Sequence, residues 1–388
     1  MYSAEKFAAV RRLFPHTRQT VYFNAASYGP FATTVQRTID RNLELRMRAD
    51  RDDTHATFAD LDALRSIYAR LIGARKREVG VGLNTSFGLN LAAFGLPLKK
   101  GDEVLISDVE FPAVAYTWRA AAEQRGLRIK FVPSVDRCFD LDLLERTIGK
   151  RTRVVSVSWV QFFNGFKVDL AELSELCQRK GLYLVVDGIQ GMGVEPINLK
   201  RIKVDVFTSG CQKWMLSPQG CGFFYLSDRV RDTMKHPWMS WLGVDWKATF
   251  TDLFRYDLPW FDSAQRFELG YYAILNILGM RAAAEFFTGL GIGNIRKHNY
   301  GLIDRLVAFL DSEPFYAVTS SMERRHRSSI VTFTCADYKQ LHRELLRKKI
   351  ILVQREGSVR ASIHLYNNEA DIDRTIKVLR SFAKKHRG

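Results

Sequence analysis

The chain has 388 residues, more than one compact core usually holds, so we expect two closely packed domains. Hydrophobic residues make up 46% and charged residues 26%, which is typical of a globular protein and excludes a disordered one. The net charge of +16 raises the question of a nucleic-acid or membrane partner. The basic residues, however, are spread over many short clusters without interleaved aromatic residues. We therefore interpret the charge as a solvated basic surface and expect neither partner.

Several other classes of protein are also excluded by sequence patterns. The stretch nearest to membrane-spanning length, residues 269–287, is interrupted by Asn276, Arg281 and Glu285. Residues 1–20 lack the apolar block of a secretory signal. The five cysteines are scattered without a Cys-x-x-Cys pair, and the eight histidines show no His-Glu-x-x-His spacing. We therefore expect a cytoplasmic protein without a metal site.

The first part of the chain alternates between strand and helix patterns. A short strand is expected at residues 21–24, followed by turn formers at 25–30 and a helical pattern at 34–72 that is interrupted near Asp50. Further strands are predicted at residues 79–82, 103–107, 128–132, 154–160 and 182–186, and helices at 86–94, 113–124 and 170–179. Several of these strands are apolar on both faces, which is typical of a sheet covered by helices on each side. The alternation predicts an α/β domain with a mostly parallel central sheet.

The pattern changes beyond about residue 272. Long helical patterns are followed by strands at residues 329–334, 350–354 and 359–364, and by an amphipathic helix at 369–384. This order indicates a smaller α+β domain. We therefore divide the chain into an N-terminal segment (1–20), a large domain (21–271) and a small C-terminal domain (272–388).

Two candidate catalytic residues follow neighbouring strands. Asp187 comes directly after the apolar run 184–186, and Lys213 lies shortly after a strand expected at 204–208. Ligands of open α/β sheets bind at the carboxyl ends of strands. A structural ion pair would explain the two residues equally well, but glycine-containing turns on both sides of Lys213 allow a ligand to approach closely. A desolvated lysine readily forms a Schiff base, and a carboxylate beside a pyridinium nitrogen makes pyridoxal phosphate an effective electron sink.

The two motifs around these residues resemble those of a known family. Residues 187–190 (Asp-Gly-Ile-Gln), followed by residues 212–214 (Gln-Lys-Trp), are similar to the class V aminotransferase family, of pyridoxal-phosphate fold type I. This family includes cysteine desulfurases, isopenicillin N epimerase-like proteins and kynureninases. The resemblance extends from Tyr22 to about Arg374. It implies a fold type I transferase whose large domain binds pyridoxal 5'-phosphate, and a homodimer.

The resemblance also implies roles for individual residues at the cofactor. Lys213 would hold it as a Schiff base, and Asp187 would pair with its ring nitrogen. Phe111 matches the position of the aromatic ring that stacks on the cofactor. Further cofactor contacts are expected from Thr85, Ser86, Gln161, Gln190, Ser209 and Gln212, with Asn164 competing for the place of Gln161. Thr85 and Ser86 precede a helix, where hydroxyls and amides either cap the helix or hold a phosphate at its positive end.

The substrate and the partner subunit involve other segments. Arg360 matches the arginine that clamps the substrate carboxylate, a task that suits its planar, two-pronged guanidinium. Asn24 is a further candidate for the same carboxylate. Residues 266–271 resemble the segment that reaches the phosphate of the neighbouring subunit. The family usually has a threonine near the glycine there, whereas this chain has Gly270 followed by Tyr271.

The reaction is predicted less sharply than the cofactor. Cysteine desulfurase is disfavoured because desulfurases stack a histidine where this chain has Phe111. In addition, residues 345–358 contain no counterpart of their mobile-loop cysteine. We expect a class V aminotransferase acting on an amino acid; a lyase that cleaves a carbon–sulfur bond and an isopenicillin N epimerase-like racemase stay open as alternatives. An idle basic binding protein is disfavoured because both Lys213 and Asp187 are present.

Overall fold

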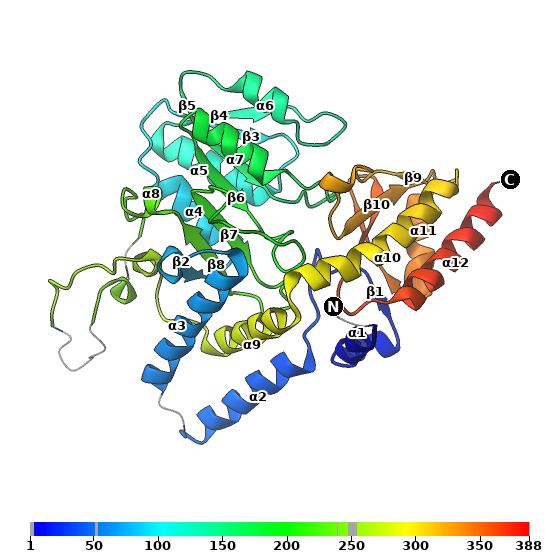
Figure 1. Ribbon diagram of the computed structural model, residues 1–388, viewed down its shortest axis with the longest axis horizontal. Helices are drawn as coiled ribbons and strands as arrows, with labels where there is room; N and C mark the ends of the chain where they lie inside the picture. Colours follow the sequence, from blue (N-terminus) through cyan, green and yellow to red (C-terminus); the bar gives the residue numbers. More distant parts are fainter. Residues whose placement is uncertain (1–3, 51–52, 239, 247–253, 388) are drawn as a thin grey trace.

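The computed structural model describes residues 4–50, 53–238, 240–246 and 254–387. These residues form a seven-stranded sheet, a four-stranded sheet and a two-stranded pair, with helices packed around them (Figure 1). Short 3₁₀ helices occur at η1 (Pro15–Arg18), η2 (Lys76–Glu78), η3 (Trp241–Gly243), η4 (Ala264–Phe267) and η5 (Arg324–His326).

The seven-stranded sheet is mostly parallel, which confirms the predicted α/β class. Its strands are β2 (Val79–Gly82), β3 (Glu103–Ser107), β4 (Arg128–Val132), β5 (Thr152–Ser158), β6 (Tyr183–Asp187), β7 (Val206–Gly210) and β8 (Gly222–Leu226). Their spatial order is β2-β8-β7-β6-β5-β3-β4. The five strands from β7 to β4 pair in parallel, whereas β8 runs antiparallel to both β7 and β2.

Helices cover both faces of this sheet, and others pack beside it. They are α2 (Thr33–Met47), α3 (Asp53–Ile72), α4 (Thr85–Gly95), α5 (Pro112–Arg125), α6 (Leu141–Thr147), α7 (Leu170–Arg179), α8 (Asp228–Arg231) and α9 (Ile274–Leu290). On β6, Leu184 and Val186 belong to one hydrophobic cluster while Val185 belongs to another that includes residues of α4 and α5. Successive side chains of the strand thus enter different cores, which is why the run is apolar on both faces. Helices α2, α3 and α9 pack together beside the sheet (Figure 1).

The four-stranded sheet belongs to the C-terminal part of the chain. Its strands are β9 (Ala317–Val318), β10 (Ile330–Thr334), β12 (Val353–Arg355) and β13 (Ser358–Ser362), in the order β12-β13-β10-β9. The helices of this part are α10 (Ile292–Ser312), α11 (Tyr338–Arg347) and α12 (Glu369–His386), and α1 (Ala4–Arg11) lies beside them (Figure 1). Strand β1 (Val21–Tyr22) pairs in parallel with β11 (Ile350–Ile351). The start of the chain is therefore joined to its C-terminal part.

Two predicted elements differ in detail from the structure. The strand expected at residues 350–354 is divided into β11, which pairs with β1, and β12, which pairs with β13. The long helical pattern is divided into α2 and α3, close to the interruption expected at Asp50. The domain limits at residues 20 and 271 stay predictions.

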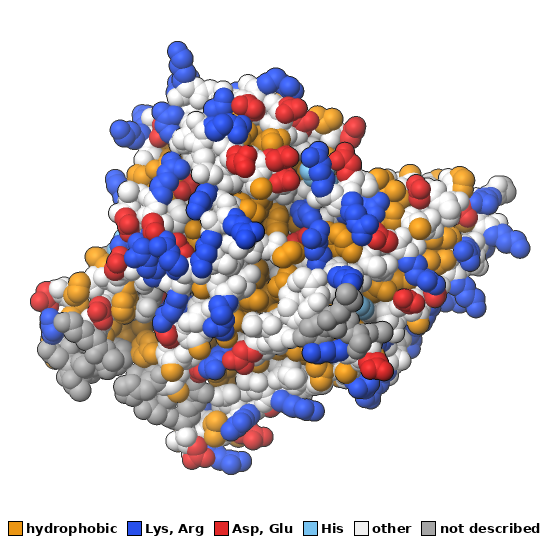
Figure 2. Space-filling view, viewed as in Figure 1, with side chains coloured by type: hydrophobic (Ala, Val, Ile, Leu, Met, Phe, Trp, Pro, Cys, Tyr) orange, Lys and Arg blue, Asp and Glu red, His pale blue; other side chains and the backbone are white. Residues whose placement is uncertain are grey.

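The surface and the helices bear on possible partners. Lysine and arginine side chains are spread over the visible face, with aspartate and glutamate between them (Figure 2). None of the described helices is long and apolar enough to cross a membrane.

Candidate active site

Asp187 and Lys213 lie at the carboxyl ends of two neighbouring parallel strands of the seven-stranded sheet. Asp187 is the last residue of β6, and Lys213 follows the end of the neighbouring parallel strand β7 by three residues. The Asp187 side chain is buried, and its Oδ1 accepts a hydrogen bond of 2.9 Å from the backbone N–H of Ile189. Among the contacts of the described residues there is no direct ion pair between Asp187 and Lys213, although each influences the pKa of the other.

The two charges are tuned mainly by burial. Burial raises the pKa of Asp187 to about 6, against the opposing effects of the Ile189 N–H and the Lys213 charge. Burial lowers the pKa of Lys213 to about 8; Asp187 opposes this shift, and the charges of Arg360 and Arg355 add to it. An amine with such a pKa is substantially neutral in mildly alkaline solution, and a neutral amine is the nucleophilic form.

Phe111 supplies an accessible aromatic surface next to the lysine. It stands at the N-cap of α5, and its ring centroid lies 5.4 Å from Lys213 Nζ. The ring is 38% exposed and makes an edge contact with Phe162, at a centroid distance of 5.1 Å. An accessible ring beside a partly buried lysine can stack on a flat ligand that the lysine holds.

Gln161 is held by a carboxylate that the sequence prediction missed. Its Nε2 donates a hydrogen bond of 3.2 Å to Glu110 Oε1. Glu110 also accepts hydrogen bonds from Ser158, through its N–H (2.9 Å) and its hydroxyl (2.5 Å). Burial raises the pKa of Glu110 to about 7; the bonds from Ser158 and Gln161 oppose the shift, and the nearby charge of Asp187 adds to it. Glu110 shortly follows β3, so the strand-end rule that indicated Asp187 would also have indicated it.

The structure separates Gln161 from its competitor Asn164. Both polar atoms of the Asn164 side chain already form hydrogen bonds within the protein. Nδ2 donates to the carbonyl of Arg137 (2.9 Å), and Oδ1 accepts from the N–H of Phe166 (3.0 Å). Gln161 Oε1, by contrast, is buried and has no hydrogen-bond partner within the described part of the chain. A buried oxygen without a partner indicates a missing ligand or water. Gln161 is therefore better placed than Asn164 to contact the cofactor.

Gln190 and Gln212 flank the loop that carries Lys213. Gln190 Oε1 accepts a hydrogen bond of 2.8 Å from Trp214 Nε1, and its Nε2 donates to the carbonyl of Ala26 at 3.1 Å. Gln190 therefore positions the residue that follows Lys213 through its Oε1, and one of its two amide hydrogens is used on the carbonyl of Ala26. Gln212 Oε1 is buried and has no partner among the residues described.

The N-terminus of α4 lies against the end of β7. Asn84 caps the helix by accepting a hydrogen bond from the N–H of Phe87, and Thr85 Oγ1 accepts one of 2.8 Å from the N–H of Gly210. Ser86 is the next residue of the helix, and Ser209 is fully buried beside Gly210, to whose carbonyl its hydroxyl donates (2.9 Å). Hydroxyls, backbone amides and a positive helix end thus converge near Lys213, which suits a phosphate group.

Arg360 is a buried cation without an acidic partner in the described structure. It lies on β13 with 1% of its surface exposed. It donates one hydrogen bond to Ser27 Oγ (2.7 Å) and one to the carbonyl of Phe162, while its Nε is buried without a partner in the described regions. Burial, and then the charge of Arg355, lower its pKa to about 9. A buried, unpaired guanidinium is costly in the free protein, so an anionic ligand would bind here favourably.

Asn24 lies beside the same strand. It forms a backbone bridge with Ser362, two residues beyond Arg360 on β13. Its Oδ1 is buried and finds no partner in the parts of the chain that the structure describes. Asn24 thus lies near Arg360, and its contact with the substrate carboxylate stays a prediction.

Gly270 and Tyr271 lie on an exposed surface segment. Tyr271 is 60% exposed and stacks on Trp241 at a centroid distance of 6.3 Å. The N–H of Gly270 donates to Ser240 Oγ at 3.0 Å. The segment is anchored by Glu268, which forms a buried two-pronged ion pair with Arg65 (2.8 and 2.6 Å). The contact of Gly270 and Tyr271 with a neighbouring subunit stays a prediction.

The residues around Lys213 fit pyridoxal 5'-phosphate. The site offers a partly buried amine, a buried carboxylate, an accessible aromatic ring and a helix N-terminus, all brought together by strand ends of one sheet. Among the site residues predicted from the sequence, four have a buried polar atom without a partner in the described regions: Asn24 Oδ1, Gln161 Oε1, Gln212 Oε1 and Arg360 Nε. Because buried polar groups are normally satisfied, this set indicates a polar ligand in contact with several of them.

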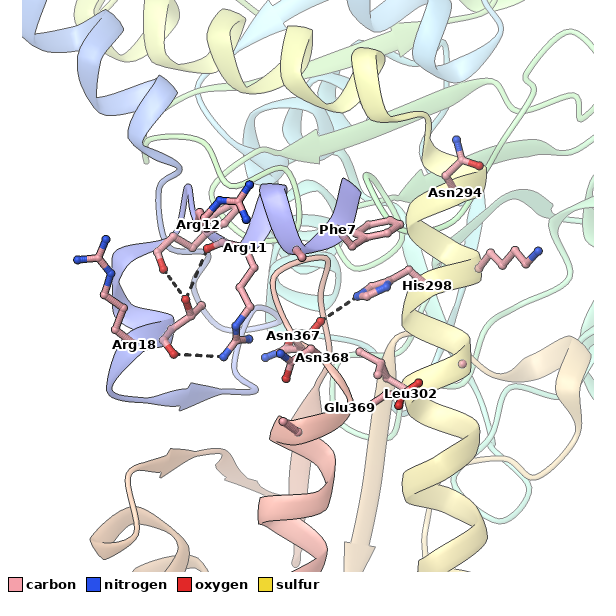
Figure 3. Close-up of a pocket in the computed structure, with 16 residues that line it drawn as sticks. Phe7, Arg11, Arg12, Arg18, Asn294, His298, Leu302, Asn367, Asn368 and Glu369 are labelled. Carbon is pink, nitrogen blue, oxygen red and sulfur yellow. Dashed lines mark hydrogen bonds between the residues drawn. The ribbon is translucent and has the colours of Figure 1, made fainter. Parts of the chain in front are cut away.

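A cavity of about 860 Å³ lies away from Lys213, between α1, α10 and the start of α12. In it the ring of Phe7 stacks on His298 at a centroid distance of 3.9 Å, and His298 Nε2 is bonded to the carbonyl of Asn367 at 2.9 Å (Figure 3). No predicted site residue is among the described residues that line it. Its size alone therefore does not connect it with the chemistry at Lys213.

Comparisons with known proteins agree with this geometry. A family model described as "Aminotransferase class-V" matches residues 23–375. An uncharacterized aminotransferase YcbU of Bacillus subtilis is 25% identical, over 94% of this chain and 95% of its own length. A probable cysteine desulfurase of Pyrococcus abyssi is 26% identical, over 97% of this chain and 98% of its own. A solved cysteine desulfurase from Thermococcus onnurineus shares the fold, with a TM-score of 0.87, 24% identity and 99% of each chain covered.

Proposed function

Because this chain belongs to the class V aminotransferase family and uses pyridoxal 5'-phosphate as its cofactor, we propose that it is an aminotransferase acting on an amino acid. The observation that carries the proposal is the buried, unpaired Arg360 in the site that also contains Lys213. The arginine suits the carboxylate of an amino acid, and the lysine suits the cofactor aldehyde.

The protein groups at the site have distinct tasks toward the cofactor. Lys213 Nζ would hold its aldehyde carbon and Asp187 its ring nitrogen, while Phe111 would cover one face of the ring. Gln161 and Gln190 would contact the ring oxygen, and the phosphate would be held by Thr85, Ser86, Ser209 and Gln212. When bound, the cofactor supplies an electron sink for the bond that breaks at the substrate Cα.

The substrate is oriented by the small sheet. Arg360 would bind the α-carboxylate through two parallel hydrogen bonds, with Asn24 beside it, and so direct the amino group toward Lys213. Lys213 Nζ has a pKa of about 8, so in its neutral form it can accept the proton from the substrate Cα.

The cysteines argue against a desulfurase that would carry the sulfur as a persulfide on its own cysteine. Burial raises the pKa of all five thiols, so none is poised as a thiolate near neutral pH. Residues 345–358 contain no cysteine. Relatives include a probable cysteine desulfurase, so membership of the family does not by itself decide the reaction.

We further propose that the protein acts as a homodimer. Large aromatic side chains are exposed on the surface segment that carries Gly270: Trp241, Phe254, Tyr256, Trp260 and Tyr271. Exposed aromatic groups gathered on one segment are typical of a protein–protein interface. This surface would then lie close to the cofactor site of the partner subunit. Residues 266–271 were expected to reach that site.

An amino-group exchange assay tests the proposed reaction. The cofactor-loaded protein is incubated with a panel of L-amino acids, each with several 2-oxo acids, and new amino acids are identified by mass spectrometry. Transamination predicts matched loss of one amino acid and gain of another. Release of sulfide or persulfide from cystine or cysteine would instead assign a lyase. Inversion at Cα without exchange would assign a racemase, and either result would overturn the proposal.

A further inference from the structure

A second cavity, of about 370 Å³, lies beside Arg360 on the polar face of the four-stranded sheet. Thr332 and Ser358 line it. Thr332 is the register partner of Arg360 across β10 and β13, and Ser358 precedes Arg360 by two residues on β13. The cavity therefore adjoins the place where the α-carboxylate of the substrate is expected.

Arg355 faces the same side of the sheet as Arg360. In the β12–β13 pair, Arg355 is opposite Ser358 and Val353 is opposite Arg360. Side chains opposite each other in an antiparallel pair, and those two residues apart on one strand, project from the same face. Arg355 and Ser358 both line the cavity, so the cavity and Arg360 share one face.

Arg355 brings positive charge that no acidic side chain pairs with in the described structure. The bond that its guanidinium donates goes to the carbonyl of Gln354, at 3.2 Å. It is close enough to lower the pKa of both Lys213 and Arg360. The other cation on the cavity wall, Arg137, is paired with Glu356 at 3.5 Å.

Hydroxyl groups line the part of the wall next to Arg355 and Thr332, while Cys138, Phe163 and Val318 make other parts of it apolar. Thr319 donates to Thr332 Oγ1 at 2.9 Å and shares a hydrogen bond of 3.1 Å with the hydroxyl of Ser358. The hydroxyl of Ser320 donates to the carbonyl of Asn164 at 2.8 Å. Asp136 also lines the cavity, but it is exposed, so solvent screens its charge. The hydroxyls beside the unpaired guanidinium of Arg355 suit an anionic group there, and the apolar parts of the wall suit the methylene groups that would carry it.

The strand geometry brings the backbone positions of the two arginines close together. Arg355 is opposite Ser358, which is two residues from Arg360, and two residues of a strand span about 7 Å. A short substrate with its α-carboxylate on Arg360 would therefore bring a second anionic group to Arg355.

We propose that this cavity is the side-chain pocket of the substrate and that Arg355 binds a second anionic group in it. The substrate is then an amino acid whose side chain ends in a carboxylate or an anion of similar size. This inference rests on the proposed function, because it places the α-carboxylate on Arg360.

Unreactive acids test the pocket without turnover. The cofactor-loaded protein is titrated with glutarate and with valerate, which differ by one carboxylate, and binding is followed by calorimetry and by the cofactor absorption. Wild type should bind glutarate about 10-fold or more tightly than valerate, as expected for a charge-assisted hydrogen bond. Arg355→Gln should remove this preference with little effect on valerate, and Arg355→Lys should keep part of it.

Arg347→Gln is the matched control, because Arg347 is exposed at the end of α11; it should keep the full preference. Thermal melting and the cofactor spectrum verify that each variant is folded and loaded. Equal loss of glutarate and valerate binding in Arg355→Gln, or no preference in wild type, would overturn the pocket assignment.

The outcome for the pocket can be told apart from the outcome for the proposed function. Preference for glutarate in a protein that exchanges no amino group supports the pocket and contradicts the aminotransferase. Amino-group exchange that is equally fast with glutamate and glutamine supports the aminotransferase and contradicts the pocket.

Discussion

Lys213 and Asp187 face one buried site from neighbouring parallel strands, yet among the described contacts they form no direct ion pair. Each charge favours the other through space, and burial disfavours both. A pair built to stabilise the fold would be expected to close into contact, because a buried charge without a partner is costly. Two opposite charges held near each other but apart are what a ligand bound by both requires.

Asp187→Asn tests the carboxylate of this pair. The side chain keeps its shape and can still accept a hydrogen bond from the N–H of Ile189, so the protein should fold and bind the cofactor. Without the negative charge the cofactor ring nitrogen is not kept protonated, and kcat/KM should fall on the order of 100-fold or more. Steady-state kinetics measure this. A loss of less than a few-fold would show that Asp187 does not have this role.

Glu110→Gln tests the second carboxylate through the stability of the cofactor-free protein. The pKa of Glu110 in the folded protein is about 7, above its ordinary value of 4.5. The folded state therefore holds the proton more tightly than the unfolded state, and this contribution is complete below 4.5 and is lost as the pH rises through 7. The variant, which is always neutral, should melt like wild type near pH 4.5 and be more stable at pH 8, by up to about 3 kcal/mol.

Melting curves of both proteins at matched pH values between 4.5 and 8 provide the check, since other titrating groups are common to both. A stability difference that is the same at every pH would mean that Glu110 does not titrate in this range.

Arg360→Lys tests the carboxylate clamp. Lysine keeps the charge but loses the two-pronged geometry, so binding of amino acids should weaken by about 10-fold or more. The matching amines, which lack the carboxylate, should bind almost as before. Spectral titration of the cofactor-loaded protein with amino acid and amine pairs measures both, and the cofactor spectrum without ligand should be unchanged. If amines and amino acids lose affinity equally, Arg360 is not the clamp.

Tyr271→Asp tests the proposed dimer surface. A charge on this 60% exposed aromatic side chain should weaken an apolar interface and shift the protein toward the monomer in sedimentation equilibrium. Tyr116→Asp is a matched control, because Tyr116 is 65% exposed on α5, and it should sediment as wild type. A wild-type protein that is monomeric and fully active would show that the site does not need a partner subunit.

The sheet and the positions of Asp187 and Lys213 could be predicted because they depend on local patterns. Apolar runs define parallel strands, and the ends of neighbouring parallel strands meet at one edge. Gln161 could not be separated from Asn164, since that depends on which amide the loop uses for its own hydrogen bonds. Arg355 could not be told from a surface arginine, because its face is set by the register between β12 and β13.

Glu110 was missed for a different reason. In this segment only the neighbouring Phe111 was interpreted as a site residue, because it matches a stacking position. The role of Glu110 depends on its hydrogen bonds with Ser158 and Gln161, which lie at the end of another strand. Such contacts arise only when two strands distant in sequence are placed side by side.

Borohydride reduction of the cofactor-loaded protein, followed by peptide mass mapping, tests whether Lys213 holds the cofactor. We expect a yellow protein in which reduction attaches the cofactor covalently to Lys213, and a Lys213→Ala variant that shows neither the colour nor the adduct. A reduced adduct at a different lysine, or one that persists in Lys213→Ala, would contradict the assignment of the site.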